Sequence, residues 1–199
     1  FTFPCTCSRK AVPDIYPGTC RQSKHHASDT TYAVRLQVPR HSVSINDRCL
    51  GLQTWDLEKE VGDFVIKRKD GLHAYQLAVV VDDIHYSVSH IVRGNDLLDS
   101  TPRQLALYEH LGASPPEYLH IPVLVDESGK KLSKQAHAKP VDTSDALTTI
   151  RSALSDLGQN THEYALSVKE LLAKAASSWN PATIPNVHDI CAPKAYLSH

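Results

Sequence analysis

Methionine is absent from the 199 residues of this sequence, which opens on Phe1-Thr2-Phe3-Pro4. A chain that is read from its own start codon begins with methionine unless that residue is removed. We therefore expect the sequence to be a piece of a longer protein. At this length, one domain, or one large and one small domain, has enough residues to bury a core and fold.

Long apolar runs are also missing, since no stretch approaches the roughly 18 apolar residues that cross a bilayer. The first residues lack the charged and apolar pattern of a secretory signal, so we expect a cytoplasmic protein without a membrane partner. Neither sign of charge dominates, because 21 Lys and Arg residues stand against 22 Asp and Glu residues. This balance argues against a general polyanion binder, but it is compatible with a nucleic acid that is contacted locally.

Only five cysteines are present, and three of them crowd together as Cys5, Cys7 and Cys20. An odd number with this clustering favours metal ligation over a disulfide framework. Cys-x-Cys offers two thiolates from one tight turn, and the Pro-Gly turn before Cys20 can bring the third thiolate back to them. Tetrahedral zinc needs a fourth donor. The candidates that the sequence leaves open for it are a water molecule, Asp14, Tyr16, His25 and His26.

Apolar residues that alternate with polar ones predict several strands. The predicted strands cover residues 31–38, 63–69, 84–92 and 118–125. The continuous apolar run at 77–81 fits either a buried strand or a buried helical turn. Arg93 follows the third predicted strand, and ligands bind at such carboxyl ends in α/β folds.

Helical patterns occupy one central segment and the last part of the chain. Thr101 is the predicted N-cap of a helix that carries proline at its first position and that Gly112 ends in the left-handed conformation. Two more helices are predicted, over 142–157 and after the N-cap Ser167. We expect the tail after Trp179 to be a loop.

Lysine gathers beside the turn that is predicted at residues 126–129. Lys130, Lys131 and Lys134 follow this turn, with Ser133 among them. Such a cationic loop can neutralise the phosphate charge that develops in a transition state, although most lysine clusters are only solvated loops.

Four blocks of sequence, taken together, resemble the catalytic core of the glutamyl-tRNA synthetases in order and approximate spacing. They cover residues 70–83, 91–98, 118–122 and 131–135, and they read DGLHAYQLAVVVDD, IVRGNDLL, YLHIP and KLSKQ. The last block resembles the KMSKS signature of class I aminoacyl-tRNA synthetases. Four blocks in order make a chance resemblance improbable.

Within this family the sequence resembles the shortened paralogue that attaches glutamate to the queuosine base of tRNA(Asp). The pattern of Cys5, Cys7, Tyr16 and Cys20 is similar to the zinc motif of that paralogue, in which tyrosine is the fourth ligand. The signature ends in Gln135, where full synthetases usually carry arginine. Too few residues follow it for the anticodon-binding region of a full glutamyl-tRNA synthetase.

The resemblance implies an α/β fold that corresponds to the second half of a Rossmann-like catalytic domain. It implies a zinc-binding segment over 1–40, the catalytic core over 41–140 and a short helical region over 141–199. The family also carries an ATP-binding signature of the His-Ile-Gly-His type before its zinc motif, and no His-x-Gly-His occurs in this sequence. We therefore expect the isolated chain to be inactive or incomplete.

The resemblance also implies roles for individual residues. Tyr75 and Arg93 match the glutamate-binding pair, while Lys131, Ser133 and Lys134 match the ATP-binding signature, the two lysines being the catalytic residues. The implied ligands are Zn²⁺, ATP with Mg²⁺, L-glutamate and tRNA(Asp) bearing queuosine. We expect the protein to be a monomer.

Other interpretations stay open. Without the resemblance, Tyr75 is a half-buried structural aromatic residue, and Arg93 forms an ion pair with Asp96 or Asp99. Two alternative functions are a fragment of a true glutamyl-tRNA synthetase and a non-catalytic, zinc-containing tRNA-binding module. The near-neutral charge counts against the second alternative.

Overall fold

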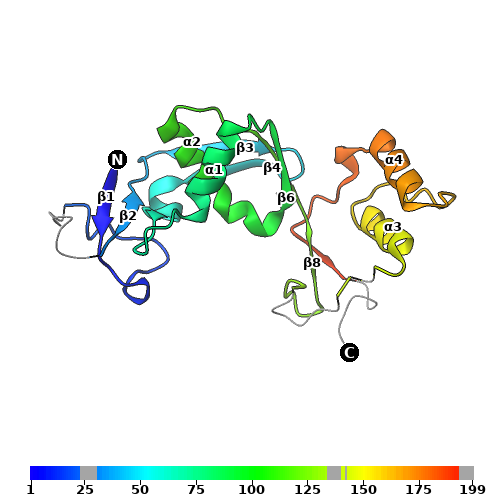
Figure 1. Cartoon of the computed structure of the whole chain (residues 1–199), viewed down its shortest axis with the longest axis horizontal. Coiled ribbons are helices and arrows are strands. Elements are labelled where there is room, and N and C mark those ends of the chain that lie inside the picture. Colours follow the sequence, from blue (N-terminus) through cyan, green and yellow to red (C-terminus); the bar gives the residue numbers. More distant parts are fainter. Residues whose placement is uncertain (23–30, 134–139, 142, 193–199) are drawn as a thin grey trace. The chain divides into compact units, whose positions relative to one another are not determined.

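The computed structural model divides the chain into two compact units (Figure 1). The described residues are 1–22, 31–133, 140–141 and 143–192. The first unit holds residues 1–46, 52–91 and 98–118, and the second unit holds residues 47–51, 92–97 and 119–199. The division of the chain into three parts that the sequence implies stays a prediction.

A three-stranded antiparallel sheet runs through the first unit. Its central strand β2 (Ala33–Leu36) pairs with β1 (Thr2–Cys5) on one side and with β5 (Phe64–Lys67) on the other. A shift in register between Val34 and Arg35 interrupts the pairing of β2 with β5. The two strands that the sequence predicts here are confirmed, although each is shorter than its pattern.

Two helices, α1 (Tyr75–His85) and α2 (Thr101–Leu111), pack against each other in the same unit. The apolar run at 77–81 therefore belongs to a helix. Gly112 ends α2 in the left-handed conformation, with φ of 65°, as its position predicts. The buried core of this unit consists of Leu36, Val38, Leu57, Val61, Phe64, Val80, Ala106, Leu107 and Tyr108.

The predicted N-cap of α2 is wrong. Thr101 is the first helical residue and is fully buried, and Ser100, at the N-cap position, has a helical backbone and makes no side-chain cap. The reason is that a 3₁₀ helix, Asn95–Ser100, runs directly into α2, so the helix has no extended residue at its start. Gln104, the expected partner in a capping box, donates instead to the side chain of Gln76 on α1.

The strand predicted over 84–92 is also wrong in its first half. Ile84 and His85 close α1, Ser87 turns the chain with φ of 55°, and the strand β6 covers only His90–Gly94. Ile84 follows the buried Val80 at the four-residue spacing of a helix, so its apolar character continues α1. Arg93 does lie at the carboxyl end of its strand.

The strand predicted over 118–125 is split by Pro122, which cannot donate to a ladder. Its first part, β7 (Glu117–Ile121), pairs with β6, and its second part, β8 (Val123–Val125), belongs to another sheet. A further pair is formed by β3 (Ser42–Asp47) and β4 (Gly51–Asp56), and a π-helical turn, Leu57–Val61, follows β4.

Two helices of the second unit, α3 (Ala146–Asp156) and α4 (Val168–Ser178), share a small core around Leu154, Leu171 and Ala175. Ser167 caps α4 as predicted, because its hydroxyl accepts the backbone N–H of Glu170 at 3.2 Å. No helix in the described part of the chain is long and apolar enough to cross a membrane.

The tail after Trp179 is more than the expected loop. It forms a 3₁₀ turn, Pro181–Thr183, and a short strand, β9 (Asp189–Cys191), which pairs in parallel with β8. Three residues are too few to show a period of two, and the partner strand lies far away along the sequence.

Replacement of Leu107 tests the packing of α2. Its side chain is 2% exposed, whereas Leu111 on the same helix is 49% exposed. We expect Leu107→Ala to lower the free energy of unfolding by about 2–5 kcal/mol, since it leaves a cavity in the core. Leu111→Ala, the matched control, should cost below about 1 kcal/mol. Urea unfolding followed by circular dichroism measures both, and equal losses would contradict the packing described.

Candidate functional site

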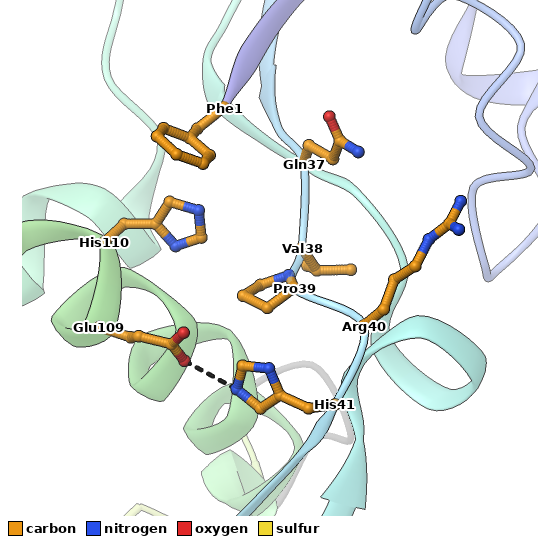
Figure 2. A pocket seen from close by; sticks show the side chains of 8 residues that line it. All are labelled: Phe1, Gln37, Val38, Pro39, Arg40, His41, Glu109 and His110. Atoms are coloured by element: carbon orange, nitrogen blue, oxygen red, sulfur yellow. Dashed lines mark hydrogen bonds and ion pairs between the residues drawn. The ribbon is translucent and has the colours of Figure 1, made fainter.

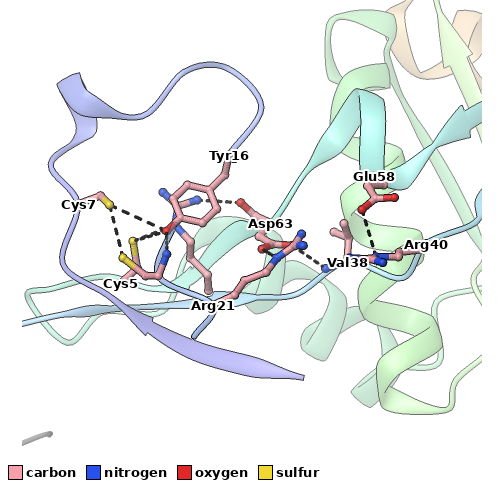
Figure 3. A network of polar contacts seen from close by, with 10 residues as sticks. Cys5, Cys7, Tyr16, Arg21, Val38, Arg40, Glu58 and Asp63 are labelled. Atoms are coloured by element: carbon pink, nitrogen blue, oxygen red, sulfur yellow. Dashed lines mark hydrogen bonds and ion pairs between the residues drawn. The ribbon is translucent and has the colours of Figure 1, made fainter. Parts of the chain in front are cut away.

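The three clustered cysteines meet in space in the first unit. The Sγ atoms of Cys5, Cys7 and Cys20 all lie within 4.8 Å of one another, and Cys5 and Cys20 are buried. The hydroxyl of Tyr16 points at the same place (Figure 3), 3.6 Å from Cys5 Sγ and 3.9 Å from Cys7 Sγ. Cys7 Sγ and Cys20 Sγ are 3.5 Å apart.

The three contacts of 3.5–3.9 Å are close to the edge lengths of a tetrahedral zinc site. Zinc binds thiolate sulfur at about 2.3 Å and oxygen at about 2.0–2.2 Å, so neighbouring donors around one ion lie roughly 3.5–3.8 Å apart. The three thiols are therefore compatible with a zinc ion, and the Tyr16 hydroxyl lies beside them. Asp14 is exposed and stands outside the cluster, and the candidates His25 and His26 lie outside the described residues.

Contacts on every side hold Tyr16 in place. Its oxygen accepts the backbone N–H of Cys20 at 2.8 Å, its ring stacks on Phe3, and the guanidinium of Arg35 lies 4.0 Å from the ring centroid. Gly62 passes close behind, with φ of 64°, and a Cβ there would stand 3.0 Å from the backbone nitrogen of Tyr16. These contacts orient the Tyr16 hydroxyl toward the sulfur atoms.

A buried carboxylate connects this cluster to the sheet (Figure 3). Asp63 has no exposed side-chain surface and accepts two hydrogen bonds, at 2.6 and 2.9 Å, from the guanidinium of Arg21. Arg21 directly follows Cys20 in the sequence. Its Oδ1 also accepts the backbone N–H of Val38 at 3.1 Å. Arg35 donates to the Asp63 carbonyl at 2.8 Å and to Cys5 Sγ at 3.3 Å.

The thiols have unequal acidity without a metal. Burial raises the pKa of Cys20, but hydrogen bonds from the Tyr16 hydroxyl, the backbone of Thr6 and the Cys7 thiol outweigh this and lower it to about 6. The hydrogen bond to Cys20 and burial raise the pKa of Cys7. Burial, followed by the hydrogen bond to Cys20, raises the pKa of Tyr16. The fold therefore favours the thiolate of Cys20 over that of Cys7.

In the second unit, Arg93 is held by a buried histidine. Its Nε donates to Nε2 of His120 at 3.0 Å, from β6 to the neighbouring strand β7. The other ring nitrogen of His120 lies 2.7 Å from Oδ2 of Asp47, and neither the His120 nor the Asp47 side chain is exposed. Of the two ion-pair partners that the sequence offers for Arg93, Asp96 and Asp99, Asp96 is paired with Lys131.

A hairpin orders the start of the lysine-rich segment. The carboxylate of Asp126 accepts the backbone N–H groups of Ser128 and Lys130 at 2.9 and 3.0 Å, and the backbone of Lys131 bridges to Val125. Lys131 donates to the Asp96 carboxylate, which follows β6. Ser133 is half-buried, and the predicted ATP-binding residue Lys134 lies outside the described residues.

Tyr75 is the first residue of α1 and is 57% exposed, so it is not the half-buried structural residue of the alternative interpretation. It belongs to the first unit, whereas Arg93 and Lys131 belong to the second. Sequence reasoning assigned no role to Asp47, Asp63 or His120. His120 stands in the quoted YLHIP block, but the two aspartates carry no local pattern that marks them.

A surface cavity of about 530 Å³ lies elsewhere in the first unit (Figure 2). The ring of Phe1 meets that of His110 edge to face there, and His41 lies 3.0 Å from the carboxylate of Glu109. Its lining consists of Phe1, Gln37, Val38, Pro39, Arg40, His41, Glu109 and His110. None of the residues that the sequence predicts for a site is among them.

Residues 13–155 match the family described as tRNA synthetases class I (E and Q), catalytic domain. The chain belongs to this family, and its mixed α/β architecture is that of the class I synthetase catalytic domain. It is 47% identical, over 92% of its length, to the glutamyl-Q tRNA(Asp) synthetase of Pseudomonas putida (strain W619). It is 44% identical, over 90% of its length, to the glutamyl-Q tRNA(Asp) synthetase of Cupriavidus metallidurans. The resemblance to this paralogue is confirmed.

The chain spans 63% and 61% of the lengths of these two relatives. Among solved structures, a glutamate tRNA ligase from Elizabethkingia meningosepticum in complex with its amino acid has a TM-score of 0.72 at 17% identity. That similarity covers 95% of this chain and 47% of the other. It shows the shared fold.

The acidity of Cys20 can be tested in the metal-free chain. We expect thiolate ultraviolet absorbance to appear with a midpoint near pH 6 and to be lost in Cys20→Ser, because hydrogen bonds favour this thiolate. The fold lowers the pKa from 9.0, so the associated stability is complete above about pH 9 and lost as pH falls through about 6. The control, Cys191→Ser at an exposed position, should keep this transition.

Proposed function

We propose that this chain carries the zinc-bearing and glutamate-binding part of an enzyme that activates glutamate with ATP and transfers it to the queuosine base of tRNA(Asp). The names of the relatives support the reaction. The observation that carries the proposal is Arg93, held at the end of β6 by a hydrogen bond to the buried His120, three residues before Asp96, the partner of Lys131.

Arg93 is the proposed ligand of a glutamate carboxylate. A guanidinium offers parallel N–H donors that match the two oxygens of a carboxylate, and it stays charged at every physiological pH. Tyr75, exposed at the start of α1, is the proposed second contact, with its hydroxyl orienting a polar group of the amino acid. Glutamine, which lacks the second carboxylate charge, would bind such a site less tightly.

Lys131, Ser133 and Lys134 are the proposed ATP-binding residues. In the reaction, a carboxylate oxygen of glutamate attacks the α-phosphorus, the acyl-phosphate bond forms and pyrophosphate leaves. The lysines stabilise the charge that builds on the phosphate oxygens, which is the main catalytic task in such a transfer. Mg²⁺ bound with ATP would add further charge neutralisation.

Cys5, Cys7, Tyr16 and Cys20 are the proposed zinc ligands. Three donor–donor distances of 3.5–3.9 Å support this assignment, since they are close to the edge lengths of a tetrahedral zinc site. A zinc ion there would join the first strand to the turn that carries Tyr16 and Cys20, which is a structural task. We further propose a cytoplasmic monomer that acts on queuosine-bearing tRNA(Asp).

Metal analysis tests the zinc site. We expect about one zinc ion per chain, and Cys20→Ala should lose it because a buried ligand is removed. Cys191→Ala, which removes an exposed cysteine outside the cluster, should retain it. A folded, metal-free wild-type chain would refute the ligand assignment.

Pyrophosphate exchange with glutamate and ATP tests the activity. We expect little or no exchange by the 199-residue chain, because its sequence contains no His-x-Gly-His signature. The full product of the open reading frame that contains this sequence should exchange and should then charge tRNA(Asp) bearing queuosine. Robust exchange by the 199 residues would contradict the expected inactivity, and charging of tRNA(Glu) instead would favour a true glutamyl-tRNA synthetase.

A further inference from the structure

Asp47, His120 and Arg93 form a chain of hydrogen bonds whose middle residue, His120, is fully buried. The side chains of Asp47 and His120 have no exposed surface. His120 Nδ1 lies 2.7 Å from Asp47 Oδ2, and His120 Nε2 receives the Arg93 Nε–H at 3.0 Å. His120, a buried histidine without a role in the proposed reaction, therefore contacts Arg93, the proposed ligand of glutamate.

The donors and acceptors around the His120 ring determine its tautomer. Arginine has donors only, so the nitrogen that faces Arg93 must present a lone pair. An ionised carboxylate has acceptors only, so the nitrogen that faces Asp47 must carry the hydrogen. His120 is consequently neutral, with its proton on Nδ1, since a doubly protonated ring would set a donor against the Nε–H of Arg93.

The surroundings of Asp47 favour its ionised form, which accepts hydrogen bonds. Its carboxylate also accepts the backbone N–H groups of Cys49 and Leu50, each at 2.9 Å, and of His120 at 3.1 Å. Burial alone raises its pKa, but these bonds and the His120 ring lower it below the ordinary value. The turn between β3 and β4 thus orients a carboxylate that orients the ring.

We propose that His120 is a positioning residue for substrate binding. By taking the Nε–H of Arg93, it directs a substrate carboxylate to the terminal amino groups of the guanidinium and away from the Nε edge. It also holds the guanidinium plane in one orientation, so less conformational entropy is lost when glutamate binds. This inference rests on the proposed role of Arg93 in binding glutamate.

The kinetic test uses the full open-reading-frame product in pyrophosphate exchange. We expect His120→Leu to raise KM for glutamate roughly 10- to 100-fold, because a hydrogen bond to a charged group is lost, and to leave KM for ATP unchanged. His120→Gln, whose amide can accept from Arg93 and donate to Asp47, should show a smaller rise. The control His90→Leu removes an exposed histidine from the same strand as Arg93 and should change neither constant.

Three results would overturn the inference. They are an unchanged KM for glutamate in both His120 variants, an equal rise of both KM values, and a Gln variant as impaired as the Leu variant. If His120→Leu fails to fold, His120→Gln still decides, through the ratio of its two KM values to those of the wild type. Absence of glutamate-dependent exchange in the wild type would refute the proposed function itself and, with it, the role assigned to His120.

¹⁵N NMR of the 199-residue chain tests the tautomer of His120 and its hydrogen bond to Arg93 independently of the activity. We expect the His120 ring to carry its hydrogen on Nδ1, with an unprotonated Nε2 that couples across the hydrogen bond to Nε of Arg93. A hydrogen on Nε2 would overturn the inference even where exchange is normal. The expected signals without any exchange would place the failure in the proposed function.

Discussion

A carboxylate that leaves water must find donors for its oxygens, and this constraint organises the candidate sites in both units. In the first unit, Asp63 joins Arg21, next to Cys20, to the backbone of Val38 after β2. In the second unit, Asp47 joins the β3–β4 turn to His120 on β7. Each carboxylate connects chain segments that are distant in sequence. Arg21, bound by Asp63, adjoins the proposed zinc ligand Cys20, and His120, bound by Asp47, contacts Arg93.

Ordinary packing brings the three clustered thiols and the Tyr16 hydroxyl together. Tyr16 stacks on Phe3, lies under Arg35 and abuts the backbone at Gly62, so its hydroxyl has one direction in which to point. Cys20 accepts several hydrogen bonds, which lower its pKa and so favour its thiolate. A site that is already shaped and partly charged costs little reorganisation when a cation binds.

Much of the local structure was predictable, and the failures share a cause. The helix end at Gly112, the N-cap Ser167 and the break at Pro122 depend on backbone rules that a few residues express. The start of α2, the end of α1 and the strand β9 depended on what the neighbouring segment does. A 3₁₀ helix ran into α2, and a distant strand, β8, paired with the tail.

The sequence by itself determined the family, the clustering of the three thiols, and the strand end that carries Arg93, because these features depend on residue type and spacing. The tyrosine beside the thiols was implied by the family resemblance alone. Only the tertiary structure decided what faces each of them. Asp63 and Asp47 carry no local pattern, and the sequence block that contains His120 does not show which groups it contacts, yet burial forces each of the three to find partners far along the chain. A sequence states which donors and acceptors exist, and only the fold determines which of them meet out of water.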